Sequence, residues 1–346
     1  NSGVLGPVKV TVDTKAPTVV ISAGSLEPIE DDGLYYTNER KPLFGAIAAD
    51  SSGGVTGTLA SGVAKVEFLY APLTPEPDAW GDFTVISEDL GTSGFAVYPP
   101  AGMPDGRYLF AIRATDKAGN QSALMTGDTP PTYVPGVIRQ VVIDNVDPTG
   151  TITAPAAGPV KDTQPVFTVS ASDASAGVKQ VLFRYALATT PTVYTTISTD
   201  TEAPYEADWG AVDLVHGVSY QLSAVVTDKI GRTYEVPAVT ITADLIAPTG
   251  AITAPTAGTV TTGQPTFTAT ATDAGSGMKQ VAFQYAAAAT PTVWNTVSVD
   301  TADPWQAVWA ITLAEGDYKF RAVLSDNAGN TFETATVDVT VDIPPT

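Results

Sequence analysis

The sequence predicts an all-β protein made of three modules in series, and three observations lead to this prediction. A strand followed by Asp-x-x-Gly occurs three times, at residues 113–120, 226–232 and 324–330. A strand that runs through Asp into a Pro-containing linker recurs where one module joins the next. Thr, Val, Ala, Gly and Pro are abundant, and no long segment carries a helical stripe of apolar residues. The repeats, rather than the length, therefore set the module count.

Each Asp-x-x-Gly motif is expected to turn a β-hairpin. The strand before it begins near a Gly and a Tyr, as in Gly316-Asp317-Tyr318. From Tyr318 to Leu324, apolar residues alternate with Lys319 and Arg321, which is the period of a half-buried strand. The Asp side chain can accept bonds from N–H groups of the turn, and the Gly can take a positive φ.

The second and third modules align at an offset of one hundred residues, so that Gln164-Pro165 matches Gln264-Pro265 and Trp209 matches Trp309. About seven strands in roughly one hundred residues is typical of an immunoglobulin-like β-sandwich. We therefore expect three tandem immunoglobulin-like β-sandwich domains in an extended rod. The alternating runs of the second module predict an inward-facing set: Phe167, Val169, Ala171, Val181, Phe183, Tyr185, Tyr220, Leu222, Ala224 and Val226.

The Pro-containing joins predict the domain boundaries, and they should be extended and stiff because proline fixes φ and restricts the preceding residue. Residues 4–12 form a strand without its own module. A cut from a longer array explains this strand better than donation to a neighbouring subunit. The expected parts are a terminal strand and linker of a preceding module (1–13), domain 1 (14–145), domain 2 (146–245) and domain 3 with the start of the next linker (246–346).

The first module is longer than the others, and its excess falls in loops at residues 24–42, 51–61, 72–82 and 121–136. Long surface loops are tolerated thermodynamically, and binding residues tend to lie on loops. Simple decoration explains the insertions better than a ligand surface. The candidate residues for binding a host or matrix glycan or protein are Tyr35, Trp80 and Tyr133.

Composition excludes several classes of function. The 37 acidic residues against 17 basic ones argue against nucleic acid, and no apolar run is long enough for membrane insertion. Cysteine is absent, which excludes disulfides and thiolate metal sites. The single histidine, His216, takes the turn position of Asp105 and Glu315, so material for a catalytic triad or a zinc site is lacking. The sequence predicts no enzyme. Four tryptophans are expected to pack rather than to form a sugar platform: Trp209, Trp294, Trp305 and Trp309.

Three motifs resemble the bacterial immunoglobulin-like repeats of large surface adhesins and related extracellular proteins. They are Val-Asp-x-x-Ala-Pro-Thr at 12–18, Glu-Gly-Asp-Tyr at 315–318 and Thr-Asp-Lys-Ala-Gly-Asn at 115–120, and the likeness covers all three modules. The resemblance implies a structural or adhesive role at the bacterial cell surface. The middle module departs from the pattern, with Lys-Ile-Gly-Arg at 229–232, and the linker after it lacks the second Asp seen at Asp147.

A cluster of carboxylates is predicted at each join. In an immunoglobulin-like sandwich the entering linker, the loop after the second strand and the last hairpin share one end, here called a pole. Crowded carboxylates with few Lys or Arg nearby favour a hard cation, and calcium takes six to eight oxygen ligands. The resemblance implies the same ion, because many adhesin members bind calcium at module junctions. The alternative is that each hairpin Asp only caps its turn. The predicted ligands are Asp13, Asp50 and Asp116; Asp144, Asp147, Asp173 and Asp228; and Asp244, Asp273 and Asp326.

These inferences favour a non-enzymatic stalk or spacer of a bacterial extracellular surface protein, stiffened by calcium, whose partners are neighbouring modules of the same longer chain. Two alternatives stay open. One is a subunit of a filament or surface layer, assembled through the strand at residues 4–12. The other is an adhesive module that binds a glycan or a protein through the loops of domain 1.

Overall fold

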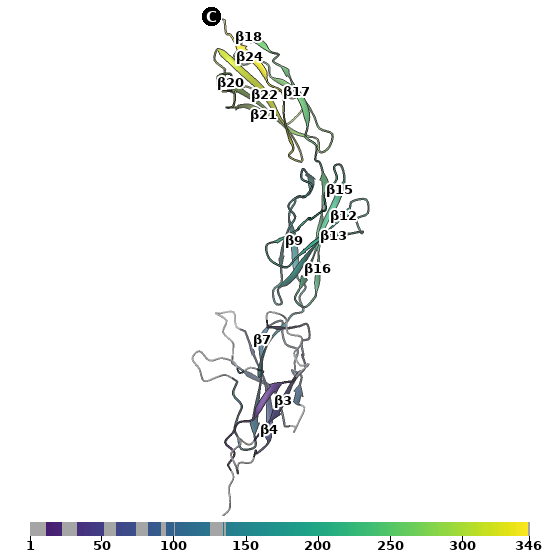
Figure 1. The fold of residues 1–346 in the computed structure, drawn as a ribbon, viewed down its shortest axis with the longest axis vertical. Helices are drawn as coiled ribbons and strands as arrows, with labels where there is room; N and C mark the ends of the chain where they lie inside the picture. The colour runs from purple at the N-terminus through teal and green to yellow at the C-terminus, as the bar shows by residue number, and fades with distance from the viewer. Residues whose placement is uncertain are drawn as a thin grey trace, which may run out of the picture. The chain divides into compact units, whose positions relative to one another are not determined.

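The computed structural model describes residues 12–22, 33–51, 60–73, 82–90, 95–99, 101–124, 134 and 136–344. Every regular element in these ranges is a β-strand (Figure 1), so the all-β prediction is confirmed. None of the described residues forms a helix that could span a membrane. The strand expected at residues 4–12, the acidic run at 27–32, Trp80 and Tyr133 lie outside the described residues, apart from Val12.

Two sheets enclose the first core, and β3, β4 and β7 of this group are labelled in Figure 1. One sheet is antiparallel with the order β1-β3-β6, and the other has the order β2-β8-β7-β4-β5. Only β2 and β8 pair in parallel. The strands are β1 Thr18–Ile21, β2 Tyr35–Thr37, β3 Phe44–Ala49, β4 Val63–Pro72, β5 Thr84–Asp89, β6 Phe95–Val97, β7 Gly106–Asp116 and β8 Ile138–Ile143.

A second pair of sheets follows, with the orders β10-β16-β15-β12-β13 and β14-β11-β9. As in the first group, a short edge strand, here β10, pairs in parallel with the last strand. The strands are β9 Thr149–Ala154, β10 Gly158–Val160, β11 Thr168–Ser172, β12 Val178–Leu187, β13 Thr195–Asp200, β14 Tyr205–Glu206, β15 Ser219–Asp228 and β16 Thr233–Ala243.

The third pair repeats this topology. Its larger sheet has the order β18-β24-β22-β20-β21, with β23 also paired to β22, and its smaller sheet joins β17 to β19. The strands are β17 Thr249–Ala254, β18 Gly258–Val260, β19 Thr268–Thr272, β20 Met278–Ala287, β21 Asn295–Asp300, β22 Gly316–Asp326, β23 Thr331–Glu333 and β24 Val337–Val341. Three pairs of sheets are compatible with the three predicted modules.

The same aromatic pair lies at the centre of each core. A Phe at the start of β3, or directly before β11 or β19, of the smaller sheet meets a Phe of the larger sheet edge to face, with ring centroids 5.2, 4.9 and 4.7 Å apart in chain order. Such offset or edge-on pairs are favourable beyond the area they bury. The pairs are Phe44 with Phe68, Phe167 with Phe183, and Phe267 with Phe283.

Most of the inward-facing set predicted for the second module is buried, and only Ala171 and Tyr185 are half-buried. Trp209 and Trp309 pack beside the central Phe rings, and their indole N–H groups donate to the carbonyls of Pro165 and Pro265 at 2.8 and 2.7 Å. These two rings are therefore part of the packing and not a sugar platform.

The chain divides into two compact units, and the division does not follow the domain joins. The first unit comprises residues 1–149 together with 172–179 and 227–234. The second comprises residues 150–171, 180–226 and 235–346. The loops at one end of the second group of strands are thus grouped with the chain that precedes them.

Candidate metal centres at the poles

Three groups of three Asp residues lie in the described part of the chain. Within each group, one carboxylate oxygen per residue lies within 4.8 Å of the corresponding oxygens of the other two. Every group combines a linker Asp, an Asp directly after β3, β11 or β19, and the Asp of the hairpin. The sequence predicts this combination but places the middle Asp after the second strand, whereas the short strands β2, β10 and β18 make that strand the third. The groups are Asp13, Asp50 and Asp116; Asp144, Asp173 and Asp228; and Asp244, Asp273 and Asp326.

The hairpin Asp is the last residue of β7, β15 or β22, and it organises its own turn. The N–H group of the residue four positions later donates to its Oδ1 atom at 2.8 Å in all three copies. The intervening glycines, Gly119, Gly231 and Gly329, have φ of 94° to 95°, a conformation that other residues resist. The hairpin Asp therefore caps its turn, and it does so mainly with one of its two carboxylate oxygens.

The Asp directly after β3, β11 or β19, here called the strand Asp, uses one oxygen to hold the following loop. N–H groups of Gly62, Gly177 and Gly277 donate to this oxygen at 2.6, 2.7 and 2.7 Å. The other oxygen is buried and has no hydrogen-bond partner in any of the three copies: Asp50 Oδ1, Asp173 Oδ2 and Asp273 Oδ1. A buried, unpartnered carboxylate oxygen is costly, and a water molecule or a cation would offset this cost.

The linker Asp connects its linker to a loop of the following module. One oxygen accepts from the N–H two residues later in the linker, and the other accepts from an N–H of the following module's loop. The second bond comes from Ser61 to Asp13 at 2.8 Å, from Ala176 to Asp144 at 3.0 Å and from Ser276 to Asp244 at 2.6 Å.

The linker carboxylates differ in their electrostatics. Burial raises the pKa of Asp144, assisted by the neighbouring Asp173 carboxylate, although N–H groups of Val146 and Ala176 oppose the shift. At the third pole burial also acts to raise the pKa of Asp244, but hydrogen bonds from Ser276 outweigh it and the pKa is lowered. Hydrogen bonds from the N–H groups of Ser61 and Lys15 lower the pKa of Asp13.

Asp147, the tenth predicted ligand, does not join a group. It lies three residues beyond Asp144, its side chain is 61% exposed, and Arg232 holds it through Nε and Nη2 at 2.8 and 2.7 Å. The sequence predicts its proximity to the pole but cannot predict that the guanidinium takes it as a partner.

Sequence reasoning missed a second role for His216. Its Nδ1 atom accepts from the N–H of Leu245 at 3.1 Å and lies 3.4 Å from Asp244 Oδ1. The histidine thus contacts the linker that leads into the third module. Its position in the turn before β15 could have indicated this contact, because that turn lies at the end of the second module from which the linker begins.

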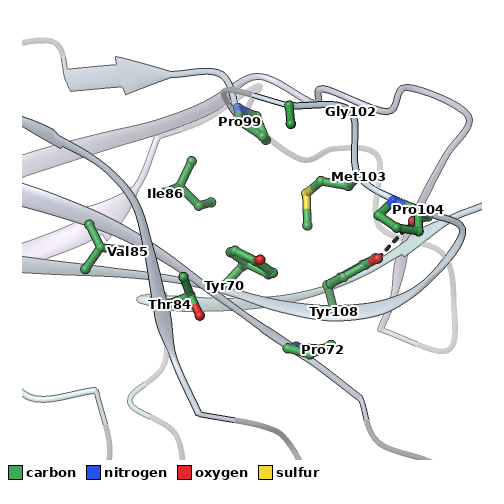
Figure 2. Close-up of a pocket in the computed structure, with 11 residues that line it drawn as sticks. Tyr70, Pro72, Thr84, Val85, Ile86, Pro99, Gly102, Met103, Pro104 and Tyr108 are labelled. Carbon is green, nitrogen blue, oxygen red and sulfur yellow. Dashed lines mark hydrogen bonds between the residues drawn. The ribbon is translucent and has the colours of Figure 1, made fainter.

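Sequence reasoning also missed a pocket of about 400 Å³ in the first group of strands. Figure 2 shows Tyr70, Ile86, Met103 and Tyr108 around it. The two tyrosine rings are 6.1 Å apart, and Tyr108 Oη donates to the carbonyl of Pro104 at 2.9 Å. Of the three predicted ligand-binding residues, Tyr35 is half-buried against the core and does not line this pocket, and the other two are outside the described residues.

The residues present at each pole fit a calcium ion. The donors are carboxylate oxygens, which hard cations prefer, and at least one oxygen per pole is buried without a partner. Cysteine, the thiolate ligand that softer metals prefer, is absent from the sequence. When bound, calcium would supply positive charge and oxygen coordination among the three carboxylates.

The fold and the poles define a protein of tandem immunoglobulin-like sandwiches with carboxylate clusters at their ends. Residues 148–227 and 248–322 match the family model for the bacterial Ig domain, and residues 87–127 match that for the bacterial Ig-like domain. These segments of the chain belong to the bacterial immunoglobulin-like domains. Domains of this kind are typically structural or adhesive units rather than enzymes.

Solved structures with a similar fold include the fibronectin(III)-like modules of Clostridium thermocellum CbhA, at 23% identity and a TM-score of 0.44, covering 56% of this chain and 95% of that one. A 1.5-MDa bacterial ice-binding adhesin is 15% identical with a TM-score of 0.31, covering 96% and 100%. A Ca²⁺-stabilized adhesin of an Antarctic bacterium is 15% identical with a TM-score of 0.27, covering 96% and 75%. No curated protein matches the sequence significantly.

Proposed function

We propose that the chain is a stalk or spacer segment of a bacterial extracellular surface protein, in which calcium at the three poles stiffens the joins between modules. The bacterial immunoglobulin-like domains support the structural role. Neighbouring modules of the same chain are then its main partners, and any host or matrix glycan or protein is contacted elsewhere or through inserted loops.

The observation that carries this proposal is the double attachment of the linker Asp. It accepts one N–H from its own linker and another from the next module's loop, as Asp144 does from Val146 and Ala176. The same carboxylate lies next to a strand Asp whose second oxygen is buried and unpartnered. A cation that neutralises these groups would hold the linker to the loop and remove the repulsion that otherwise opposes their contact.

The division of the chain into compact units supports stiff joins. The loops that form the second pole, 172–179 and 227–234, are grouped with the preceding residues up to 149. The third pole lies wholly in the second unit. Each of these two joins is therefore inside a compact unit instead of forming the boundary between units.

Small-angle X-ray scattering in calcium and in a chelator tests the proposal. Chelation should make the chain more flexible and broaden its distance distribution, while far-UV circular dichroism stays nearly unchanged, because each module has its own core. Magnesium in place of calcium is the matched control, because it demands a tighter octahedral geometry. Identical scattering curves with and without calcium would contradict the proposal.

The pocket beside Tyr70 favours a second function, adhesion to a glycan. Its walls combine two tyrosine rings with Ile86 and Met103, and Pro72 and Thr84 on its rim flank one of the inserted loops. Val85 also lines it and is 44% exposed, so Val85→Glu should block a sugar without disturbing the core. Binding on a glycan array that Val85→Glu abolishes would support adhesion, whereas no binding by the unmodified chain would count against it.

A further inference from the structure

One position at which the three poles differ is the residue four places after the hairpin Asp. This residue is Asn120 at the first pole, Arg232 at the second and Asn330 at the third. Its backbone N–H donates to Oδ1 of the hairpin Asp at the same distance, 2.8 Å, in every copy. The turn backbone therefore makes the same bond at this position in all three poles, and the side chain there differs.

At the two outer poles the asparagine amide bonds to both the hairpin Asp and the linker. Nδ2 of Asn120 and of Asn330 donates to Oδ2 of the hairpin Asp at 2.8 Å. The same nitrogen also donates to the carbonyl oxygen of the linker Asp, at 3.1 Å in the first pole and 2.8 Å in the third. The amide thus engages two oxygens that a cation could otherwise bind.

At the middle pole the corresponding side chain points elsewhere, because Arg232 pairs with Asp147. Oδ2 of Asp228 is left without a hydrogen-bond partner although this residue is 0% exposed. Asp173 Oδ2 is a second buried, unpartnered oxygen in the same group. The outer poles have one such oxygen each, on Asp50 and on Asp273.

We infer that the middle pole binds calcium more tightly than the outer poles, and that the identity of the residue at position 232 sets this order. The inference rests on the proposed function, in which all three poles take calcium. A cation at the middle pole meets two carboxylate oxygens that no amide already engages. At the outer poles it shares the hairpin Asp with a charge-assisted hydrogen bond, which weakens the attraction available to it. The join after Asp144 is consequently the first to stiffen as calcium rises.

Isothermal titration calorimetry of calcium into the whole chain measures this order. The expected isotherm has one tighter site and two weaker sites. The dissociation constant of the tighter site should be about tenfold lower than those of the other two, which corresponds to one hydrogen bond to a charged group. Asp228→Asn should remove the tighter site and leave the weaker two. Circular dichroism checks that each variant is folded.

Two substitutions of Arg232 separate the amide from the charge. Arg232→Asn restores the amide of the outer poles and should weaken the tighter site about tenfold. Arg232→Ala removes the same positive charge without adding an amide, so it should leave this affinity unchanged or raise it.

Any of three outcomes would overturn the inference while leaving calcium binding intact. They are three sites of equal affinity, loss of a weaker site in Asp228→Asn, and an equal decrease in the affinity of the tighter site in both Arg232 variants. The absence of any binding heat in the unmodified chain, with calcium and with terbium as a second probe, would instead overturn the proposed function and the inference with it.

Discussion

The hairpin Asp and the strand Asp of each pole use one carboxylate oxygen mainly for backbone N–H groups, whereas both oxygens of the linker Asp accept from backbone N–H groups. The hairpin Asp caps its turn with Oδ1, and the strand Asp holds its loop with one oxygen and leaves the other buried. Turn capping and cation binding are therefore compatible at the hairpin Asp and the strand Asp, because one oxygen can bond to the backbone while the other binds a cation. The sequence predicts nine of these residues from the shared topology of the sandwich.

The raised pKa of Asp144 gives a pH dependence with a definite sign. Because the fold favours the protonated form, this group contributes stability to the calcium-free chain below its unfolded pKa, and the contribution is lost as pH rises through the folded pKa. Calcium requires the ionised form, so the affinity of the middle pole should fall as the pH is lowered towards the raised pKa of Asp144.

Calorimetry in two buffers of different ionisation enthalpy checks this prediction, because calcium binding should release protons when the pH is low enough for Asp144 to be protonated. Asp228→Asn, which lacks the middle site, is the control for the outer poles. An affinity that rises on acidification would contradict the assignment.

At the scale of strands, two modules place a guanidinium over the same aromatic position by different routes. Arg184 of β12 lies 4.0 Å from the Tyr194 ring and contacts Ser223 of β15. In the third module Arg321 of β22 lies 4.1 Å from the Trp294 ring and bonds to Gln284 of β20. The arginine therefore lies on neighbouring, paired strands in the two modules. Each guanidinium also pairs with a carboxylate, Glu235 or Glu333.

This exchange predicts compensation between paired strands. Arg184→Gln alone should destabilise the second module by about 1 kcal/mol, through loss of the cation–π contact and the ion pair. Adding Ser223→Arg should restore most of this loss, because it reproduces the arrangement of the third module. Urea denaturation of both variants measures the difference. Equal instability of the single and double variants would contradict the shared role.

An ion network on the first large sheet gives a further prediction. Burial acts to raise the pKa of Glu67, but Arg113 and Lys65 outweigh it, and the pKa is lowered. This stabilisation is present above the unfolded pKa of Glu67 and is lost as pH falls through the folded one. Glu67→Gln should cost about 1–3 kcal/mol near neutral pH and less in acid, as measured by urea denaturation at two pH values. A cost that grows in acid would contradict this account.

Strand periodicity predicts which side chains face the cores, because alternation needs only local sequence. It does not predict contacts that depend on strand register or on side-chain direction. Alignment at the offset of one hundred residues matches Arg184 with Gln284. Only the pairing of Gln284 with Arg321 shows that Arg321 takes the role of Arg184 in the third module. Tyr70 and Tyr108 meet in a pocket because β4 and β7 are paired, and Asp147 leaves its pole because Arg232 faces it.

For the whole molecule, calcium should couple the unfolding of neighbouring modules. A cation that binds only the folded pole stabilises it by about 2.7 kcal/mol at one hundred times its dissociation constant. Because each pole contains groups from a linker and from the following module, this energy is lost when either unfolds. Differential scanning calorimetry should show separate transitions in chelator that shift upward and merge in calcium. Transitions that stay separate and unshifted would argue that the modules are independent.

Crystallography of the chain grown in calcium, with anomalous data, tests the central claim most directly. The account predicts one ion at each described pole, bound by an oxygen of the linker, strand and hairpin Asp at about 2.3–2.6 Å. Water molecules at these positions, without an anomalous peak and with the carboxylates turned apart, would contradict it.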